Sequence, residues 1–369
     1  MKILVTGAKG FVGRNLIVQL KNLDFCDIFE FDVDSEAGLI EAYTQECEFV
    51  FHLAGVNRPV NDSDFMAGNF GFTSVLLDAL KKHNNKAPVL ISSSIQAELD
   101  NPYGLSKKAG EDLLFAYSKE TGAAVYVYRL HNIFGKWCRP NYNSAVATFC
   151  NNIANELPIQ VSDPNVTMNL IYIDDLVNEF INVLGGNVNL KDNYCHVEPV
   201  YTSSLGDIVE LIKSFKDSRE DRSIADMSDL FTKKLYSTYL SYLPADKFSY
   251  PLTMNIDNRG SFTEFIKTHD RGQVSINISH PGITKGNHWY HTKNEKFLVV
   301  SGRGIIKFRR IDSDVVIEYN VSGDKLEVVD IPTGYTHNII NTGDIDMVTV
   351  MWANETFDKE RPDTYYLEV

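Results

Sequence analysis

Three residues in the first third of the chain have the types and spacing of a proton-transfer site. Ser94 ends a run of three serines, Tyr103 follows nine residues later, and Lys107 comes four residues after the tyrosine. Positions four apart on a helix share a face, so the Lys107 ammonium would lie near the Tyr103 phenol and favour its ionised form. Tyr103 could then exchange a proton with a sugar oxygen that the Ser94 hydroxyl orients.

A second group of residues that could do chemistry lies in the last quarter of the chain. His288, His291 and Glu295 fall within eight residues, and His337 follows in a separate segment. Three imidazoles and one carboxylate form a coherent ligand set for zinc or another divalent cation. The sequence therefore predicts a metal or catalytic site built from these four side chains.

The element that must position the first group begins at the third residue. An apolar run at 3–5 leads into three glycines, and an amphipathic segment follows at 14–21. In such a strand–turn–helix unit the first glycine allows the turn, the second lets the backbone approach a pyrophosphate, and the third lets helix and strand pack. The free N–H groups at the helix start would then face the phosphates. The residues predicted to hold a dinucleotide here are Gly7, Gly10, Phe11, Val12 and Gly13.

Six further positions are candidates for cofactor binding, and two of them conflict. Asp32 closes the second predicted strand, where an acidic residue would bind the ribose hydroxyls of NAD. Lys9, inside the glycine turn, could instead hold the 2′-phosphate of NADP. Leu53, Ala54 and Gly55 end a buried strand at 49–53 in small residues that leave room for a cofactor. Asn69 opens or caps the helix that follows.

Two domains are predicted from the change in pattern near Pro244. Strands alternate with helices over 1–243, which predicts an α/β Rossmann fold with a parallel sheet and a small substrate region over 141–243. A polar connector covers 244–252. An all-β barrel or sandwich over 253–369 is expected because short alternating strands recur at 274–279, 296–300, 304–310, 315–320, 325–330, 337–341 and 346–352.

Composition limits the partners and the compartment. The net charge of −14 argues against nucleic acid or an anionic membrane surface as a partner. Five scattered cysteines without a C-x-x-C pair predict reduced thiols in a cytoplasmic protein. There is no signal peptide pattern, and no apolar run approaches the ~20 residues that a membrane span needs. Arg129, Arg139 and Arg222 are open candidates for binding a nucleotide pyrophosphate.

Residues 1–243 resemble the extended short-chain dehydrogenase/reductase family, whose members act on nucleotide sugars. Where the dehydratases of that family carry an acid pair, this chain has Ile95 and Gln96, so water elimination is disfavoured. The interval from Ser94 to Tyr103 is also shorter than is usual in the family, so we expect the loop between these residues to be trimmed. The family motifs match Gly7, Gly10 and Gly13, the strand end 53–55, Asn69, the set Ser94, Tyr103 and Lys107, the segment 128–135 and the Asp-Asp signature in 171–175.

Residues 253–369 resemble the cupin superfamily, and within it the deoxysugar 3,5-epimerase branch. The resemblance to that branch implies a base in the element 285–288 and a catalytic lysine at Lys296. The branch uses its histidine as a base and generally lacks metal, whereas the cupin motif makes His288 a ligand, so both roles stay open. The cupin motifs fall on His288, His291, Glu295, Gly302, Pro332, Gly334, His337 and Asn341, and the branch motif on Asp257, Arg259, Gly260, Phe262 and Glu264.

The whole chain resembles the CapF-type family of bifunctional capsular polysaccharide enzymes. These act on a UDP-linked 2-acetamido-4-keto-6-deoxyhexose on the route to UDP-N-acetyl-L-fucosamine, and the resemblance implies NADPH, zinc and a homodimer. We therefore expect C3 epimerisation in the barrel, followed by reduction of the C4 ketone in the first domain. Two alternatives remain: a reductase with a non-catalytic dimerisation or binding cupin, and a redox-neutral epimerase that retains its NAD(H).

Overall fold

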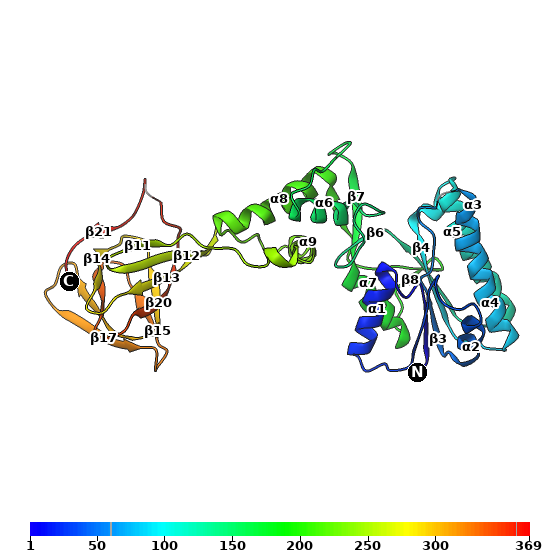
Figure 1. Cartoon of the computed structure of the whole chain (residues 1–369), viewed down its shortest axis with the longest axis horizontal. Helices are drawn as coiled ribbons and strands as arrows, with labels where there is room; N and C mark the ends of the chain where they lie inside the picture. Colours follow the sequence, from blue (N-terminus) through cyan, green and yellow to red (C-terminus); the bar gives the residue numbers. More distant parts are fainter. Residues whose placement is uncertain (60, 359) are drawn as a thin grey trace. The chain divides into compact units, whose positions relative to one another are not determined.

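The computed structural model describes residues 1–59, 61–358 and 360–369, and it divides into two compact units (Figure 1). The N-terminal unit comprises Met1–Lys213 and Leu230–Pro244, and the C-terminal unit comprises Ser214–Asp229 and Ala245–Val369. The segment Ser214–Asp229 thus groups with the C-terminal unit, whereas the sequence pattern placed it in the first domain. Within that unit Arg222 pairs with Glu264 at 3.2 Å, and the backbone N–H of Ile224 donates to the Lys267 carbonyl.

The N-terminal unit is built on a seven-stranded sheet in the order β2-β1-β3-β4-β5-β9-β8. Its strands are parallel from β2 to β9, and only β8 runs antiparallel. Strands β1 and β3 are buried at every position, as expected for a parallel sheet covered on both faces. The strands of this sheet are β1 (Ile3–Thr6), β2 (Ile28–Phe31), β3 (Phe49–His52), β4 (Val89–Ser94), β5 (Val125–Leu130), β8 (Leu190–Lys191) and β9 (Tyr194–Cys195).

Helices cover the two faces of this sheet and bury separate apolar clusters (Figure 1). Leu16 of α1 and Phe180 of α7 belong to one cluster, whereas Leu76 of α4 and Leu114 of α5 belong to the other. This two-layer covering confirms the predicted Rossmann fold. The helices of this part are α1 (Phe11–Asn22), α2 (Leu39–Glu46), α3 (Ser63–Phe65), the π-helix η1 (Met66–Gly71), α4 (Phe72–Lys82), the 3₁₀ helix η2 (Ile95–Glu98), α5 (Pro102–Thr121) and α7 (Ile173–Leu184).

A small sheet in the order β10-β7-β6 forms the rest of the N-terminal unit with α6, α9 and the start of α8. The two acids that begin α7 explain the Asp-Asp signature, since Asp174 pairs with Lys136 at 2.5 Å and Asp175 pairs with Lys234 at 2.7 Å. The first pair fixes the loop after β6 to the start of α7, and the second fixes helix α9 to the same turn. The elements are β6 (Asn132–Phe134), α6 (Ala145–Ala154), β7 (Thr167–Tyr172), β10 (Tyr201–Ser204), α8 (Leu205–Asp221) and α9 (Leu230–Leu240).

The C-terminal unit consists of two antiparallel sheets, which confirms the all-β expectation. Their orders are β11-β12-β13-β20-β15-β18 and β17-β16-β19-β14-β21. Strand β13 alternates buried and half-buried positions, and Phe297, Ile306 and Ile339 belong to the apolar core. The elements are the 3₁₀ helix η3 (Ala245–Lys247), β11 (Asn255–Asp257), β12 (Gly260–Thr268), β13 (Gly272–Ser279), β14 (Thr284–Trp289), β15 (Glu295–Ser301), β16 (Arg303–Arg310), β17 (Val316–Ser322), β18 (Val328–Ile331), β19 (Tyr335–Asn341), β20 (Met347–Ala353) and β21 (Tyr365–Tyr366).

None of the helices in the described part of the chain is both long enough and apolar enough to cross a bilayer.

Candidate active sites

The glycine turn lies where the strand order reverses, between β1 and β3. Parallel sheets bind ligands outside the carboxyl ends of their strands at such a point. Gly7 has φ +69°, and a β-carbon there would lie 2.7 Å from the Ala54 nitrogen. A β-carbon on Gly13 would lie 2.2 Å from the Gly7 carbonyl oxygen. Both positions therefore require glycine, and the turn packs directly against the loop that follows β3.

The start of helix α1 has the features of an anion site. Helix α1 begins at Phe11 after Gly10, and no side chain caps it. The first N–H groups of a helix have no partner within the helix, and its dipole favours negative charge at that end. The turn, with Phe11 and Val12 at the helix start, is therefore suited to a pyrophosphate.

Asn69 lies in the site but does not cap a helix. It is 5 % exposed and sits inside the π-helical turn η1. Its Oδ1 accepts from the Val56 N–H at 2.9 Å, and its Nδ2 donates to the Val56 carbonyl and to Ser106 Oγ at 3.1 and 2.9 Å. Asn69 thus ties the loop after β3 to helix α5, so its place in the cofactor site is to position that loop.

Gly55 makes room for the Lys107 side chain. A β-carbon at Gly55 would lie 3.0 Å from Lys107 Nζ and 3.0 Å from Asn69 Oδ1. Lys107 is 8 % exposed, and its Nζ donates to the Ser92 carbonyl at 3.2 Å. Glycine is therefore needed at position 55 because the lysine head reaches the loop that follows β3.

Helix α5 brings Tyr103 and Lys107 together as the sequence predicts. The helix starts cleanly because Asn101 caps it, accepting from the Gly104 N–H at 2.8 Å, and Pro102 occupies its first position. Lys107 Nζ lies 5.8 Å from the centre of the Tyr103 ring, and the Tyr103 hydroxyl donates to Asn57 Oδ1 at 3.2 Å.

The protonation of this pair differs from the expectation that the lysine acidifies the tyrosine. Burial raises the pKa of Tyr103, and the Ser94 hydroxyl acts in the opposite direction. Burial lowers the pKa of Lys107 to about 8, against the attraction of Glu111. Lys107 is not among the groups that lower the tyrosine's pKa. Tyr103 therefore holds its proton at neutral pH, which suits a group that must donate one.

Of the three arginines considered for a pyrophosphate, two are held in ion pairs. Arg129 pairs with the fully buried Glu111 at 2.7 Å, and Arg222 pairs with Glu264 in the C-terminal unit. Arg139 is exposed and lies over the Tyr142 ring at 5.1 Å. Arg139 is therefore the one of these three that remains available to a phosphate.

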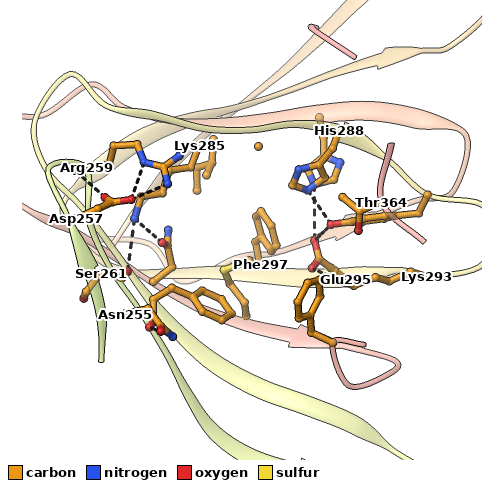
Figure 2. A pocket seen from close by; sticks show the side chains of 18 of the residues that line it. Asn255, Asp257, Arg259, Ser261, Lys285, His288, Lys293, Glu295, Phe297 and Thr364 are labelled. Carbon is orange, nitrogen blue, oxygen red and sulfur yellow. Dashed lines mark hydrogen bonds and ion pairs between the residues drawn. The ribbon is translucent and has the colours of Figure 1, made fainter. Parts of the chain in front are cut away.

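Strand pairing in the C-terminal unit brings together three of the four predicted metal ligands. His288 on β14 lies opposite His337 on β19, and Glu295 begins β15. One ligand atom from each of His288, Glu295 and His337 lies within 4.8 Å of the others. Figure 2 shows His288 and Glu295 facing each other at one end of a pocket.

These three side chains fit a divalent cation. His337 is 1 % exposed, and neither of its ring nitrogens has a hydrogen-bond partner within the described residues. A buried polar atom without a partner is costly unless a ligand or water satisfies it. Burial and the neighbouring His337 lower the pKa of His288 to about 4, so its imidazole is neutral, as a ligand or base must be. The pKa of Glu295 lies below its ordinary value because His337, Lys293 and Tyr290 together outweigh its burial.

The structure does not bring His291 into this cluster. Side chains alternate faces along an extended strand, so a residue three positions after His288 faces the other way. His291 is exposed and packs edge-on against Trp289 and Tyr365. Tyr290 occupies the inward position instead. Its hydroxyl donates to Glu295 Oε2 at 2.9 Å and lies 2.7 Å from His288 Nε2.

The structure likewise separates Lys296 from the pocket. Its side chain is half exposed and pairs with Asp330 at 2.5 Å, because Glu295 faces inward and the next residue must face outward. Lys293 lies in the pocket, with Nζ 3.9 Å from Glu295 Oε1 and 5.1 Å from the centre of the Tyr290 ring. Tyr290, which the sequence analysis missed, lies two positions after His288. The alternation of side chains along a strand could have identified it as the next residue to face the pocket.

The pocket has a volume of about 700 Å³, within the range of sites for small ligands. At its second end Lys285 Nζ donates to Asn277 Oδ1 at 2.8 Å and to the Ile278 carbonyl at 2.7 Å, and Arg259 pairs with Asp257 at 2.6 Å. Figure 2 shows these two polar ends, with Phe297 between them, as His288, Glu295, Lys293 and Thr364 on one side and Asp257, Arg259, Lys285 and Ser261 on the other.

Comparisons with known proteins agree with this two-part architecture. Residues 3–193 match the NAD dependent epimerase/dehydratase family, and residues 255–365 match the polysaccharide biosynthesis C-terminal domain. The chain is 46% identical to UDP-2-acetamido-2,6-beta-L-arabino-hexul-4-ose reductase from Pseudomonas aeruginosa strain PA103, covering 100% of this chain and 99% of that protein.

Solved structures give the same result. The capsular polysaccharide assembling protein CapF from Staphylococcus aureus is 57% identical, with a TM-score of 0.95 and full coverage of both chains. The UDP-glucuronic acid 4-epimerase from Bacillus cereus, in complex with NAD, covers 66% of this chain and 98% of its own at 18% identity, with a TM-score of 0.54. At that identity the second likeness shows the fold alone.

A Rossmann sheet with a glycine turn and a tyrosine–lysine pair on one helix defines an oxidoreductase of the short-chain dehydrogenase/reductase type. The chain belongs to the NAD dependent epimerase/dehydratase family and, over its whole length, to the CapF-type enzymes of capsular polysaccharide biosynthesis.

Proposed function

We propose that this chain carries out two consecutive steps on a UDP-linked 2-acetamido-4-keto-6-deoxyhexose. The C-terminal unit epimerises C3, and the N-terminal unit then reduces the C4 ketone, towards UDP-N-acetyl-L-fucosamine for capsular polysaccharide. The observation that carries the proposal is the cluster of neutral His288, ionised Glu295 and His337 in a pocket of sugar size, separate from the tyrosine–lysine pair. The reductase activity of the Pseudomonas relative supports the reductive step and the substrate class.

In the reductive step the residues of α5 and β4 handle the ketone oxygen. Ser94 orients the C4 oxygen, Tyr103 donates its proton to that oxygen, and Lys107 holds positive charge beside them. The nicotinamide supplies the hydride when it is bound. The raised pKa of Tyr103, caused by burial, supports this direction of reaction, since a reductase must deliver a proton to the new alkoxide.

In the epimerisation step the proton at C3 is acidic because it lies next to the C4 carbonyl. A neutral imidazole of the cluster removes it, and protonation from the other face inverts the centre. The Lys293 ammonium beside Glu295 stabilises the negative charge on the enolate oxygen. Zinc or another divalent ion held by Glu295 and His337, and also by His288 where that residue is a ligand rather than the base, would act as a Lewis acid on the same oxygen. His288 is either a ligand of that ion or the base.

The other end of the pocket supports a nucleotide diphosphate as the non-reacting part of the substrate. Arg259 and Lys285 place two cations against the single carboxylate of Asp257 there. Guanidinium and ammonium groups are the usual partners of phosphate oxygens. A homodimer and a cytoplasmic location, which the likeness to CapF-type enzymes implies, complete the proposal.

Deuterium uptake tests the proposal. The full chain is incubated with a UDP-4-keto-6-deoxy-HexNAc in deuterated water, without reduced nicotinamide, and C3 is followed by mass and proton spectra. We expect exchange that His288→Asn abolishes and Tyr103→Phe retains. When reduced nicotinamide is added, Tyr103→Phe should fail to reduce the ketone.

Two other outcomes would contradict the proposal. Reduction of the ketone without any exchange at C3 would leave a plain reductase with a non-catalytic C-terminal unit. Conversion without net consumption of reduced nicotinamide, by a protein that purifies with NAD(H) bound, would show a redox-neutral epimerase.

A further inference from the structure

A fully buried histidine ends β3, directly before the loop that packs against the glycine turn. His52 is 1 % exposed, and both of its ring nitrogens have partners. Nδ1 lies 2.7 Å from Thr6 Oγ1 at the end of β1, and Nε2 lies 2.8 Å from Thr73 Oγ1 on α4. Burial, with repulsion from Lys107, lowers the pKa of His52 to about 3, so the imidazole is neutral.

The partners of the two threonines fix the direction of each hydrogen bond around this ring. The Thr73 hydroxyl donates its one proton to the Asn69 carbonyl at 2.5 Å, so His52 must donate to Thr73 from Nε2. Nδ1 is then the acceptor, and the Thr6 hydroxyl donates to it. The Ala54 backbone N–H donates to Thr6 Oγ1 at 3.3 Å. The imidazole therefore has one tautomer, and it links the loop after β3 to the π-helical turn η1.

The Asn69 side chain extends this connection to the helix that carries Tyr103. Its Nδ2 donates to Ser106 Oγ at 2.9 Å, and the Ser106 hydroxyl donates to the Tyr103 carbonyl at 2.7 Å. Asn69 Oδ1 and Lys107 Nζ also approach the same face of Gly55. One buried network of hydrogen bonds thus runs from the loop after β3 to the first turn of α5. Its members in order are Ala54, Thr6, His52, Thr73, Asn69, Ser106 and Tyr103.

We infer that this buried network positions Tyr103 against the loop after β3, with His52 as its central positioning residue. The inference rests on the reductive step of the proposed function. Hydrogen bonds in a buried network polarise one another, so the loss of one link weakens its neighbours. Because Tyr103 must meet the ketone and the nicotinamide together, a displacement of about 1 Å is enough to lower the rate by up to about 10²-fold.

Two buried threonines allow the network to be tested apart from the stability of the fold. Thr73→Val removes one hydroxyl of the network and keeps the shape of the side chain. Thr44→Val is the matched control, because Thr44 is also fully buried on a helix and its hydroxyl also donates four residues back, to the Ile40 carbonyl at 2.7 Å. We expect both variants to lower the melting temperature. Only Thr73→Val should lower kcat for ketone reduction, by about tenfold to a hundredfold with little change in KM, while deuterium uptake at C3 stays unchanged in both.

A second break tests whether the network is continuous. Ser106→Ala removes the link to Tyr103 and should lower kcat in the same range as Thr73→Val. Because both substitutions interrupt one network, the double variant should lose little more kcat than the worse single variant. Losses that multiply, or a loss of kcat in Thr44→Val equal to that in Thr73→Val, would overturn the inference.

The central residue provides a rescue test. His52→Leu should lower kcat as Thr73→Val does, whereas His52→Gln, whose amide both donates and accepts, should recover part of that loss. Equal kcat values in these two variants would overturn the inference alone. Absence of ketone reduction by the unsubstituted chain would instead overturn the proposed reductive step, so that rate is measured first.

Discussion

At the scale of single residues, Lys107 combines a positive charge with nearly complete burial. Burial lowers its pKa to about 8 from the ordinary value of 10.5. The folded state therefore binds this proton less tightly than the unfolded chain, and the cost is present at neutral pH and disappears as pH rises from 8 towards 10.5. We expect the unfolding free energy of the protein, relative to Lys107→Met, to rise by about 2 kcal/mol between pH 7 and pH 10.

Denaturant unfolding of the two proteins at both pH values measures this difference. Lys119→Met, an exposed lysine on the same helix, is the control and should show no such change. A constant difference between the protein and Lys107→Met would mean that Lys107 is not titrating in this range.

The two lysines that flank Glu295 form a natural matched pair. Lys293 faces the pocket and Lys296 faces outward towards Asp330. Removing one preorganised donor to a developing oxyanion costs about 10²–10³ in rate. We therefore expect Lys293→Met to slow deuterium uptake at C3 by about that factor and Lys296→Met to leave it unchanged. The reverse result would return the catalytic role to Lys296.

Motif spacing correctly predicted which side chains lie together where a single helix carries them. Tyr103 and Lys107 lie on a single helix, so their spacing alone put them on one face. His291 was chosen from motif spacing and Lys296 from the resemblance to the epimerase branch. Each lies next to an inward-facing residue, Tyr290 or Glu295, and a motif does not reveal which face a position takes. The charge state of Tyr103 also could not be predicted, because burial depends on residues far away in the chain.

At the scale of elements, a buried ion pair joins the parts that carry the reductase residues. Glu111 on α5 accepts from Arg129 of β5 at 2.7 and 2.9 Å and from Ser93 of β4 at 2.6 Å. Arg129 also donates to Glu98 on η2 at 2.7 Å. Glu111 lies one turn after Lys107, and Ser93 precedes Ser94, so the pair fixes β4 against α5.

Breaking this pair should disturb the site as well as the fold. Removing one partner of a buried pair typically costs 3–5 kcal/mol, whereas replacing both with apolar residues is often neutral. We expect Glu111→Gln to lower both stability and kcat. The double variant Glu111→Leu/Arg129→Met should recover melting temperature without recovering kcat, since Ser93 loses its tie. Full recovery of both would mean that the pair is only structural.

The C-terminal segment closes the wall of the second site. Asp363 accepts from the backbone N–H groups of His291, Thr292 and Lys293 at 3.0, 2.8 and 2.9 Å. Strand β21 then pairs with β14, the strand that carries His288. The loop that holds Lys293 therefore depends on a carboxylate some seventy residues away.

Loss of that carboxylate should affect one reaction only. We expect Asp363→Ala to slow C3 exchange while ketone reduction stays unchanged, with Asp363→Asn intermediate because its amide oxygen still accepts. Metal content, measured in parallel, controls for loss of the cluster itself. Equal loss of both reactions would instead indicate general destabilisation.

The prediction of strands failed where the local sequence does not show the apolar alternation of a strand, although the segment pairs within a sheet. Seven strands of the C-terminal unit were predicted from alternation, but β11, β12, β14 and β21 were not, and in β14 the residues Lys285, Gly286 and Asn287 give no apolar alternation. Lys285 lines the pocket and Asn287 accepts from Asn338, and the pairing of β14 with β19 sets the places of both side chains.

At the scale of the whole molecule, the fold class followed from the change of rhythm near Pro244. Repeating strand–helix units predict a parallel sheet covered by helices, whereas short alternating strands predict antiparallel sheets. The hydrophobic periodicity of each half therefore predicted its own fold class. The segment Ser214–Asp229 escaped this reasoning. Its polar composition gives no period, and its assignment to the C-terminal unit depends on contacts such as Arg222 with Glu264.

Both sites belong to one polypeptide, and this fixes the ratio in which the two sites are made. Two separate enzymes would leave that ratio variable. Under the proposed function, every epimerising centre is made together with one reducing centre, however strongly the protein is expressed. Under the proposed function, the standing pool of the epimerised ketone is then set by the two turnover numbers and by the supply of reduced nicotinamide, and not by gene dosage. A change in expression would scale the flux through both steps and leave the ratio of their capacities unaltered.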